Sequence, residues 1–353
     1  MLNVMKNSAL SAKVHAMQRT TLHRADYEAL IQLRSVAEVA AYLKEHTRYA
    51  AALDSVNPAM LHRGQMEGLL KAQIMSDILS LLPYFDISNR FFIETMELEE
   101  AIEVLKVFLN LLMTGHTEQF SLTGRDLRIG KSVLSARQLA EAADFSALLE
   151  LLRPTVFYRP LRSFADDPER QTPFYLDIAL DNFLAERTDK YTTKYLGAKD
   201  AAIVRKAYGA EVDLHNLTYI LRAKLRLDMS KEQLYACIIP VYYRLRQGVI
   251  AELAECTDYR EAVQLIKEKT PYGDAVDLDD RFIEKRVNEY LFAMQRRLLR
   301  QNPYSIQIAV GYLALRRFEI KNIVSIIEGI RYGLPPNQIK DYLVGVYGEE
   351  ESA

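Results

Sequence analysis

The chain has 353 residues, 49% apolar and 26% charged, so it can bury a large core and is expected to be globular rather than disordered. Its formal net charge of -2 argues against nucleic acid as a partner, because nucleic-acid binding requires an excess of basic residues. The two cysteines, Cys237 and Cys256, match neither a zinc site nor a disulfide framework, and both are expected to be small buried side chains.

No targeting or membrane-spanning segment is expected. Residues 1–17 contain scattered lysines and no uninterrupted apolar run, unlike a signal peptide. The longest uncharged stretch, residues 301–315, is shorter than the roughly 18 to 20 residues that a spanning helix needs. We therefore expect a soluble chain without a membrane span of its own.

Helical periodicity dominates the sequence, and no segment alternates apolar and polar residues for long enough to predict a strand. The fold class is therefore predicted to be all-α. In chain order, the clearest helices are expected over 59–82, 98–114, 173–196, 230–247 and 278–300, with a last helix from Pro335 or Pro336 to Gly348.

A short pattern occurs three times along the chain. It consists of an acidic residue, an aliphatic residue, a variable residue and an asparagine, and each copy follows an apolar residue. Its copies are Asp86-Ile87-Ser88-Asn89, Asp213-Leu214-His215-Asn216 and Glu319-Ile320-Lys321-Asn322. When the second asparagine is aligned on the third, the apolar residues of the following helix also superimpose, whereas the first copy shares only Ile93 of that face. The match is therefore firmest between the second and third copies.

A second landmark precedes each copy of the first. It is a helix that ends in a threonine followed by an aromatic residue. The three pairs are Thr47 and Tyr49, Thr155 and Phe157, and Thr270 and Tyr272. Because the two landmarks keep the same order in every third of the chain, the sequence predicts an internal triplication.

The predicted repeats cover residues 1–116, 117–229 and 230–353. Each is longer than the roughly 20 to 50 residues typical of extended solenoids, so we expect three similar helical domains in a pseudo-threefold, funnel-like arrangement. Such an arrangement has two unlike ends and can enclose a central hollow. It would suit an adaptor between other proteins.

The acidic residue and the asparagine of each copy are interpreted as structural. An acidic residue at the start of a helix interacts favourably with the unpaired N–H groups there. The asparagine three positions later lies on about the same side and can hydrogen-bond a neighbouring segment. The alternative is that the asparagines contact a partner directly.

No catalytic, cofactor-binding or metal site is predicted. The segment that ends in Gly130-Lys131-Ser132 has five residues after Gly124, where a phosphate-binding loop needs four. Asp277, Asp279 and Asp280 suggest the aspartates of helical prenyl-transfer enzymes, but Ile283 stands where a further aspartate would fall, which favours a capping cluster. The six histidines never pair at metal-ligand spacing with acidic partners.

Four basic residues near the second and third copies are candidate partner-contact residues. They are Arg222, Lys224, Arg316 and Arg317. Lys224 stands out because it falls on the apolar face of its helix, where the third repeat has Ile330. These residues are interpreted first as solvated helix faces. The alternative is that some of them line a hollow that receives an acidic partner surface.

Three segments carry a resemblance to a known family. They are Asp213 to Asn216 followed by Leu221-Arg222-Ala223-Lys224, the opening from Ala12 to Met17 with Thr47-Arg48-Tyr49, and Phe318 to Ile323 followed by Gly329 to Leu334. In this order and at this chain length, they resemble the C subunit of the V/A-type (vacuolar/archaeal-type) ATPases, which is named d in eukaryotes. The first copy departs from this pattern, because Arg90 to Thr95 contain nothing like Leu221 to Lys224.

The resemblance implies an all-helical funnel that is not itself an enzyme and binds no cofactor. Members of this family are cytoplasmic and peripheral to the membrane. They sit on the membrane rotor ring, the c/K ring, and hold the foot of the central stalk, so that torque passes between the ATP-handling head and the ring. The expected partners are therefore the central-stalk subunits and the ring, with no nucleic acid.

Two other classes of function stay open at this point. A general helical-repeat scaffold for other proteins would form an open superhelix with a long concave groove. A helical enzyme with metal-dependent lyase or transferase activity would use the aspartates near residue 280.

Overall fold

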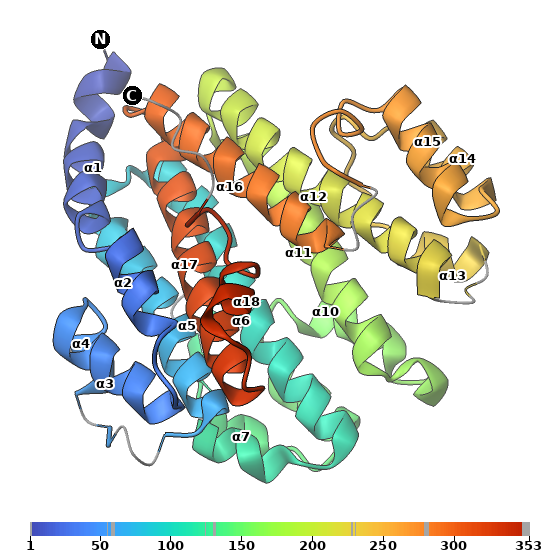
Figure 1. Ribbon diagram of the computed structural model, residues 1–353. Helices are drawn as coiled ribbons and strands as arrows, with labels where there is room; N and C mark the ends of the chain where they lie inside the picture. The colour runs from blue at the N-terminus through green and yellow to red at the C-terminus, as the bar shows by residue number, and fades with distance from the viewer. Residues whose placement is uncertain are drawn as a thin grey trace. The chain divides into compact units, whose positions relative to one another are not determined.

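A computed structural model describes residues 2–54, 56–57, 61–123, 125–129, 132–226, 229, 231–278 and 282–347. These residues form eighteen α-helices, a few short 3-10 turns and one two-stranded hairpin (Figure 1). The prediction of a mostly helical fold is therefore confirmed. Among the described helices, none combines the length and the apolar character needed to cross a membrane.

Backbone contacts divide the chain into two compact units. Unit 1 combines Met1–Asp86 with Asn288–Ala353, and unit 2 is the continuous segment Ile87–Val287. This division does not test for sequence repeats, so the three repeats with boundaries after residues 116 and 229 remain a prediction.

Unit 1 brings the N-terminal and C-terminal segments of the chain together around one long helix, α17. Its helices are α1 (Leu2–Gln18), α2 (Arg24–Leu30), α3 (Val36–His46), α4 (Ala50–Leu53), α5 (Arg63–Leu81), most of α16 (Ile283–Gln301), α17 (Gln307–Arg331) and α18 (Pro336–Lys340). Helix α17 packs against α5, α1 and α3, and it buries residues around most of its circumference. A helix that is apolar on most sides is stable only when several neighbours cover it.

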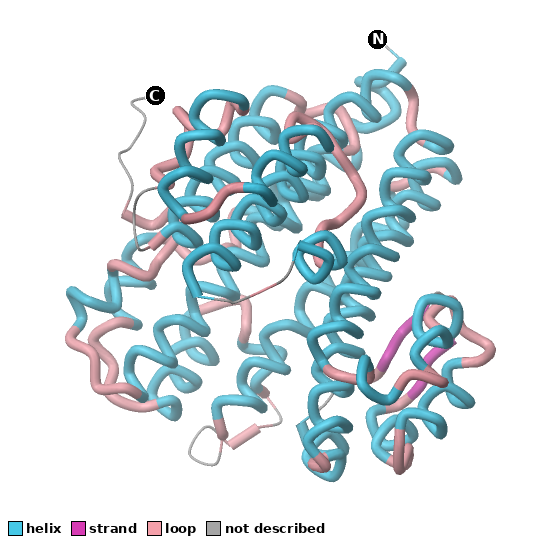
Figure 2. The backbone as a smooth tube through the Cα atoms, turned by 90° about the vertical axis from the view of Figure 1, so that its right-hand side faces the viewer, coloured by secondary structure: helices cyan, strands magenta, loops and turns pink. Residues whose placement is uncertain are grey.

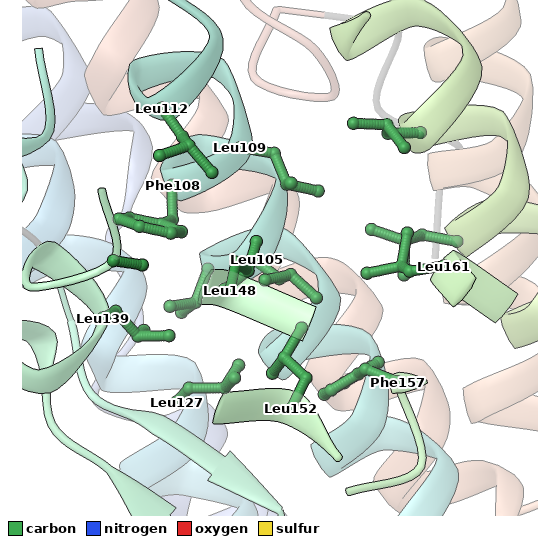
Figure 3. Close-up of a cluster of buried hydrophobic side chains, with 14 of the residues drawn as sticks. Leu105, Phe108, Leu109, Leu112, Leu127, Leu139, Leu148, Leu152, Phe157 and Leu161 are labelled. Atoms are coloured by element: carbon green, nitrogen blue, oxygen red, sulfur yellow. The ribbon is translucent and has the colours of Figure 1, made fainter. Parts of the chain in front are cut away.

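Unit 2 is built around the packing of α6 along α11. Its elements are α6 (Ile87–Thr114), α7 (Thr117–Thr123), β1 (Leu127–Ile129), β2 (Ser132–Leu134), α8 (Ala136–Ala140), α9 (Phe145–Leu152), α10 (Tyr158–Leu161), α11 (Pro173–Tyr195), α12 (Ala198–Arg226), α13 (Lys231–Ala236), α14 (Gln247–Glu255) and α15 (Tyr259–Lys269). Leucine and phenylalanine side chains from α6, β1, α8, α9 and α10 form the core drawn in Figure 3. Phe108 lies within it and meets the ring of Phe120 edge to face.

The hairpin of β1 and β2 was not predicted from the sequence. The strands are antiparallel, with Leu127 opposite Leu134, and they appear in magenta in Figure 2. Each strand has three residues, which is too short for an alternating pattern to be read. Gly124, Gly130 and Lys131 of the loop considered above lie outside the described residues.

The helices expected over 59–82, 173–196 and 278–300 are present with shifts of at most five residues at their ends. The helix expected over 98–114 was predicted too short, because α6 begins at Ile87, and two others were predicted too long. Within the segment expected as a helix over 230–247, α13 ends at Ala236, and the last predicted helix ends at Lys340. Pro240 contributes to the first error, because a proline has no N–H to donate and pushes the preceding residue out of the helical region. In the second, Gly345 has φ of 71°, a conformation that favours glycine and that no continuing helix adopts.

Replacing Phe108 by alanine is expected to lower the free energy of unfolding by about 3–5 kcal/mol, because it leaves a cavity in the core of unit 2. Val107 is the matched control, since it is the preceding residue of the same helix and is 48% exposed. Val107→Ala should change stability by less than about 0.5 kcal/mol. Urea unfolding followed by circular dichroism measures both, and equal losses would contradict the packing described here.

Candidate functional site

The threonine–aromatic landmark forms the same turn at three places in the structure. Each threonine hydroxyl donates to the carbonyl of a residue three or four positions earlier, and the N–H of the aromatic residue donates to the threonine oxygen. The hydroxyl-to-carbonyl distances are 2.6 Å for Thr47, 2.7 Å for Thr155 and 2.9 Å for Thr270. The turns end helices α3, α9 and α15, whose first turns are capped by Ser35, Asp144 and Asp258.

The acidic residue of the second copy lies in the middle of α12, not at a helix start as the capping interpretation expected. Asp213 is fully buried and accepts hydrogen bonds from the backbone N–H groups of Tyr243, Arg244 and Leu245. It also accepts one from the hydroxyl of Tyr272, at 2.8 Å. The carboxylate therefore fastens the segments before α14 and after α15 to the middle of α12.

The acidic residue of the third copy forms an equivalent junction in unit 1. Glu319, in the middle of α17, accepts hydrogen bonds from the N–H of Leu22 at 2.9 Å and from the hydroxyl of Tyr49 at 2.8 Å. Leu22 stands just before α2, and Tyr49 belongs to the turn after α3. The two landmarks thus meet in space, and the tyrosine comes from a different predicted repeat than the acidic residue. The spacing of residues along the chain gives no sign of this pairing, because it depends on tertiary packing.

The asparagines of the same two copies form matching ties. The amide of Asn216 donates to the carbonyl of Ile239 and accepts from its N–H, at 3.1 and 3.0 Å. Asn322 makes the same pair of bonds with Val344, both at 2.9 Å. The side-chain amide supplies the donor and the acceptor that the backbone N–H and carbonyl of Ile239 and Val344 would otherwise find within a helix. The helices before these two residues can therefore end early. Both asparagines are buried, so they serve as internal ties.

The first copy occupies a different place in its helix. Asp86 directly precedes α6, and Asn89 lies in the first turn of that helix, although the other two copies are halfway along α12 and α17. The first copy therefore shares the residue types of the pattern with the other two copies but not their position in a helix. Phe157, the aromatic residue that corresponds to Tyr49 and Tyr272, has no hydroxyl and packs in the apolar core of unit 2.

A buried network of charged residues surrounds the junction in unit 1. Arg316 is 0% exposed, and its guanidinium donates to Asp77 at 3.0 Å, to the hydroxyl of Tyr49 at 3.0 Å and to Glu319. Arg48 donates to the other oxygen of Asp77 at 2.5 Å. Two cations therefore meet two anions inside unit 1, which keeps the charges compensated.

This network shifts the protonation equilibria of its members in the directions its charges require. Burial alone would lower the pKa of Arg316, but Tyr49, Glu319 and Asp77 raise it above its usual value, so the guanidinium stays charged. Burial and the neighbouring Asp77 raise the pKa of Tyr312 to about 12, so its hydroxyl remains a donor. Asp77 was missed in sequence analysis, although its place on the buried face of α5, between Ile74 and Ile78, was a usable signal.

The four basic candidates have different environments. Arg316 is enclosed, so its role in this structure is internal and it presents no surface to a partner. Lys224 donates to the carbonyls of Ala254 and Cys256 at 2.9 and 2.6 Å, which ties α12 to the end of α14. Arg222 is exposed and pairs with Glu284, and Arg317 is partly exposed. Partner contact remains a prediction for the exposed members.

A second group of titratable residues lies between α6 and α11. Lys106 is paired with Asp181 at 2.6 Å, and Asp177 stands one helical turn earlier on α11. Burial raises the pKa of Asp177 to about 6, with Lys106 opposing the shift and Asp181 and Glu103 adding to it. One oxygen of Asp177 is buried and has no hydrogen-bond partner among the described residues.

The described residues contain no group of three or more histidine, cysteine or acidic side chains that could hold a metal ion. Asp277 lies within the described part of the chain, whereas Asp279 and Asp280 lie outside it. Both cysteines are buried and unpaired with each other, and burial raises the pKa of each thiol, which disfavours the reactive thiolate.

The sequence of this chain is similar to a family model and to several known proteins. The family model described as ATP synthase (C/AC39) subunit matches residues 10–342. The chain is 24% identical over 350 residues to the C subunit of the A-type ATP synthase of Methanosphaera stadtmanae, covering 95% of this chain and 86% of that protein. It is 24% identical to the protein of the same name from Methanobrevibacter smithii, over 95% and 87%, and 21% identical to that of Thermococcus kodakarensis, over 94% and 89%.

Asn216→Ala is expected to destabilise the chain by about 2–4 kcal/mol, because the N–H and carbonyl of Ile239 would both lose their partner in a buried setting. Lys206→Ala, an exposed change in the same helix, should have little effect. Unfolding in guanidinium chloride measures the loss of stability in each variant. If the two losses were equal, Asn216 would not act as a tie.

Arg316→Met is expected to cost about 3–5 kcal/mol of stability, because it leaves the buried carboxylate of Glu319 without its cation. The double change Arg316→Met with Glu319→Gln should be less harmful than the single change, since Arg48 still balances Asp77. Arg317→Met is the control on the neighbouring position. Thermal unfolding by calorimetry tests the order, and a double variant weaker than the single one would contradict the charge argument.

Asp177 should make unit 2 less stable as the pH rises from about 4 to 6. A raised pKa means that the folded chain binds the proton more tightly than the unfolded chain, so this contribution is favourable only at low pH. Asp177→Asn should remove this part of the pH dependence and raise stability at pH 7. Glu186→Gln, at an exposed position of the same helix, should leave the profile unchanged. Urea midpoints measured between pH 4 and 7 decide between these outcomes.

Proposed function

Because this chain belongs to the ATP synthase (C/AC39) subunit family, we propose that it is a non-catalytic connector in the central stalk of a rotary ATP synthase. In this role it joins the rotor shaft to the ion-translocating ring in the membrane and is cytoplasmic, held at the membrane through the ring. The match of the family model over residues 10–342 carries the proposal, because it spans nearly the whole chain.

The internal construction of the chain is consistent with passing torque. A connector needs to resist twisting between its two partners, and rigid contacts at buried positions provide that resistance better than surface contacts. The junctions at Asp213 and Glu319 fasten segments far apart in sequence to the middle of two long helices. The bonds from the hydroxyls of Tyr272 and Tyr49 to these carboxylates are buried, so breaking them would leave polar groups without partners.

The decisive experiment is purification of the tagged full-length chain from its own host. The central-stalk subunits and the membrane ring should be recovered with it, and a complex depleted of the chain should hydrolyse ATP without pumping ions. A chain that stays monomeric in a lysate containing the assembled ATP synthase would contradict the proposal. An elongated scattering envelope with an open groove would instead favour a general helical-repeat scaffold.

Arg222→Glu is expected to weaken the association of the chain with the stalk subunits by about tenfold at low salt, with little effect on folding. Arg222 is 54% exposed and its pairing with Glu284 is a surface ion pair, so the charge is available to a partner at small cost. Arg205→Glu is the matched control, since it is an exposed and ion-paired arginine of the same helix. Binding measured at two salt concentrations should show the effect for Arg222 alone, and equal effects would argue against partner contact there.

A further inference from the structure

Unit 1 contains a cavity of about 370 Å³ beside the Glu319 junction. It is lined by the turn before α2, by α16 and α17, and by the segment after α18. Its volume falls within the roughly 300–1,000 Å³ that small-molecule sites occupy. The walls combine the rings of Tyr27, Phe292 and Tyr312 with several charged groups.

The charged groups of the cavity are mainly positive. Arg24, Arg296 and Arg316 line it, and Glu319 is its one carboxylate among the described lining residues. Glu319 is already engaged by Arg316, Tyr49 and the N–H of Leu22. Arg24 pairs with Glu28, which does not line the cavity. Arg296 is therefore the exposed cation for which the cavity itself provides no free carboxylate.

The buried arginine has one donor group left over. Its Nε and Nη1 groups bind Asp77, Tyr49 and Glu319, but Nη2 is buried and has no hydrogen-bond partner among the described residues. An unsatisfied buried donor is unfavourable, and more so when it is charged. Such a group in a native fold calls for a specific explanation, such as a ligand or ion.

The matching junction in unit 2 shows that the fold does not require this arginine. When Asn322 is aligned on Asn216, Arg316 corresponds to Ala210 and Leu315 corresponds to Gly209. Tyr243 packs so closely on Gly209 that an added Cβ would lie 2.5 Å from the Cβ of Tyr243. Asp213 there is satisfied by three backbone N–H groups and one hydroxyl. A junction of this kind therefore forms without an arginine.

We propose that the cavity binds a small oxyanion, a carboxylate or a phosphate, between the buried Arg316 and the exposed Arg24 and Arg296. The planar guanidinium group suits both ligands, because its parallel N–H groups match two oxygens of either anion. The ligand would satisfy Nη2 of Arg316, balance the charge of Arg296 and compete with Glu28 for Arg24. This inference does not depend on the connector role, since it rests on unit 1 alone.

Calorimetric titration of the full-length chain tests the proposal with two probes, sodium phosphate and sodium citrate, at low ionic strength. Sodium chloride at matched ionic strength is the reference for a general salt effect. Saturable binding of one anion per chain is expected for at least one probe, together with a rise in the unfolding temperature that chloride does not produce. Binding of phosphate alone or citrate alone identifies which oxyanion the site takes.

Arg296→Gln should weaken the binding about tenfold, as expected for the loss of one charge-assisted hydrogen bond. Arg297→Gln is the matched control, because Arg297 is the next residue, is exposed and does not line the cavity. Arg316→Lys keeps the charge, removes Nη2 and should weaken binding further. If that variant does not fold, Arg296→Gln and Arg24→Gln carry the test.

The proposal is overturned if neither anion gives saturable binding, or if Arg297→Gln weakens binding as much as Arg296→Gln. The second result would show that the anion responds to the general charge of α16 and not to the cavity.

Discussion

The structure depends on carboxylates buried in the middle of long helices. A charged group in such a position is unfavourable unless it is fully hydrogen-bonded, and here each one uses its bonds to hold distant segments of the chain. Asp213 fastens the segments around α14 and α15 to α12, and Glu319 fastens those around α2 and α3 to α17. The helices that carry these residues can then be long and largely buried, because the surrounding short helices are fixed to them by direction-specific bonds as well as by apolar packing.

The buried carboxylates of the two junctions accept hydrogen bonds from different sets of donors. In unit 2 a short aspartate is satisfied by the N–H groups of three consecutive residues and one tyrosine hydroxyl. In unit 1 the longer glutamate takes one backbone N–H and one hydroxyl, and Arg316 supplies the rest. Arg316 also donates to Asp77, and Arg48 donates to the other oxygen of the same carboxylate. The glutamate, which is one methylene longer than the aspartate, is thus part of a four-residue charge network of Arg48, Asp77, Arg316 and Glu319. This network connects α17 to α5 and to the turn after α3.

The sequence predicted the residue types of these junctions better than their geometry. Helical periodicity and the paired landmarks led to a helical fold and to the asparagine ties, since both depend on spacing within one helix. The meeting of Tyr49 with Glu319 could not be predicted in this way, because it joins residues 270 positions apart and depends on tertiary packing. The first copy misled for a related reason. The match of residue type at Asp86, Ile87 and Asn89 carried no information on helical position, and only the second and third copies shared a helix face as well. The early ends of α13 and α18 have the same origin, because asparagine side chains outside the segment satisfy the backbone at Ile239 and Val344.

Two copies of one junction within a chain provide an internal comparison that a single site does not. Features common to both, such as the buried acid, the asparagine tie and the tyrosine hydroxyl, are what the joint itself requires. Features present in one copy alone need another explanation, and these are Arg316, the space beside it and the arginines around that space. Where Ala210 and Gly209 let Tyr243 close against α12, the corresponding Arg316 and Leu315 accompany a lined cavity with an unpaired donor. The part of unit 1 that departs from its counterpart is therefore where a ligand has the strongest physical reason to bind.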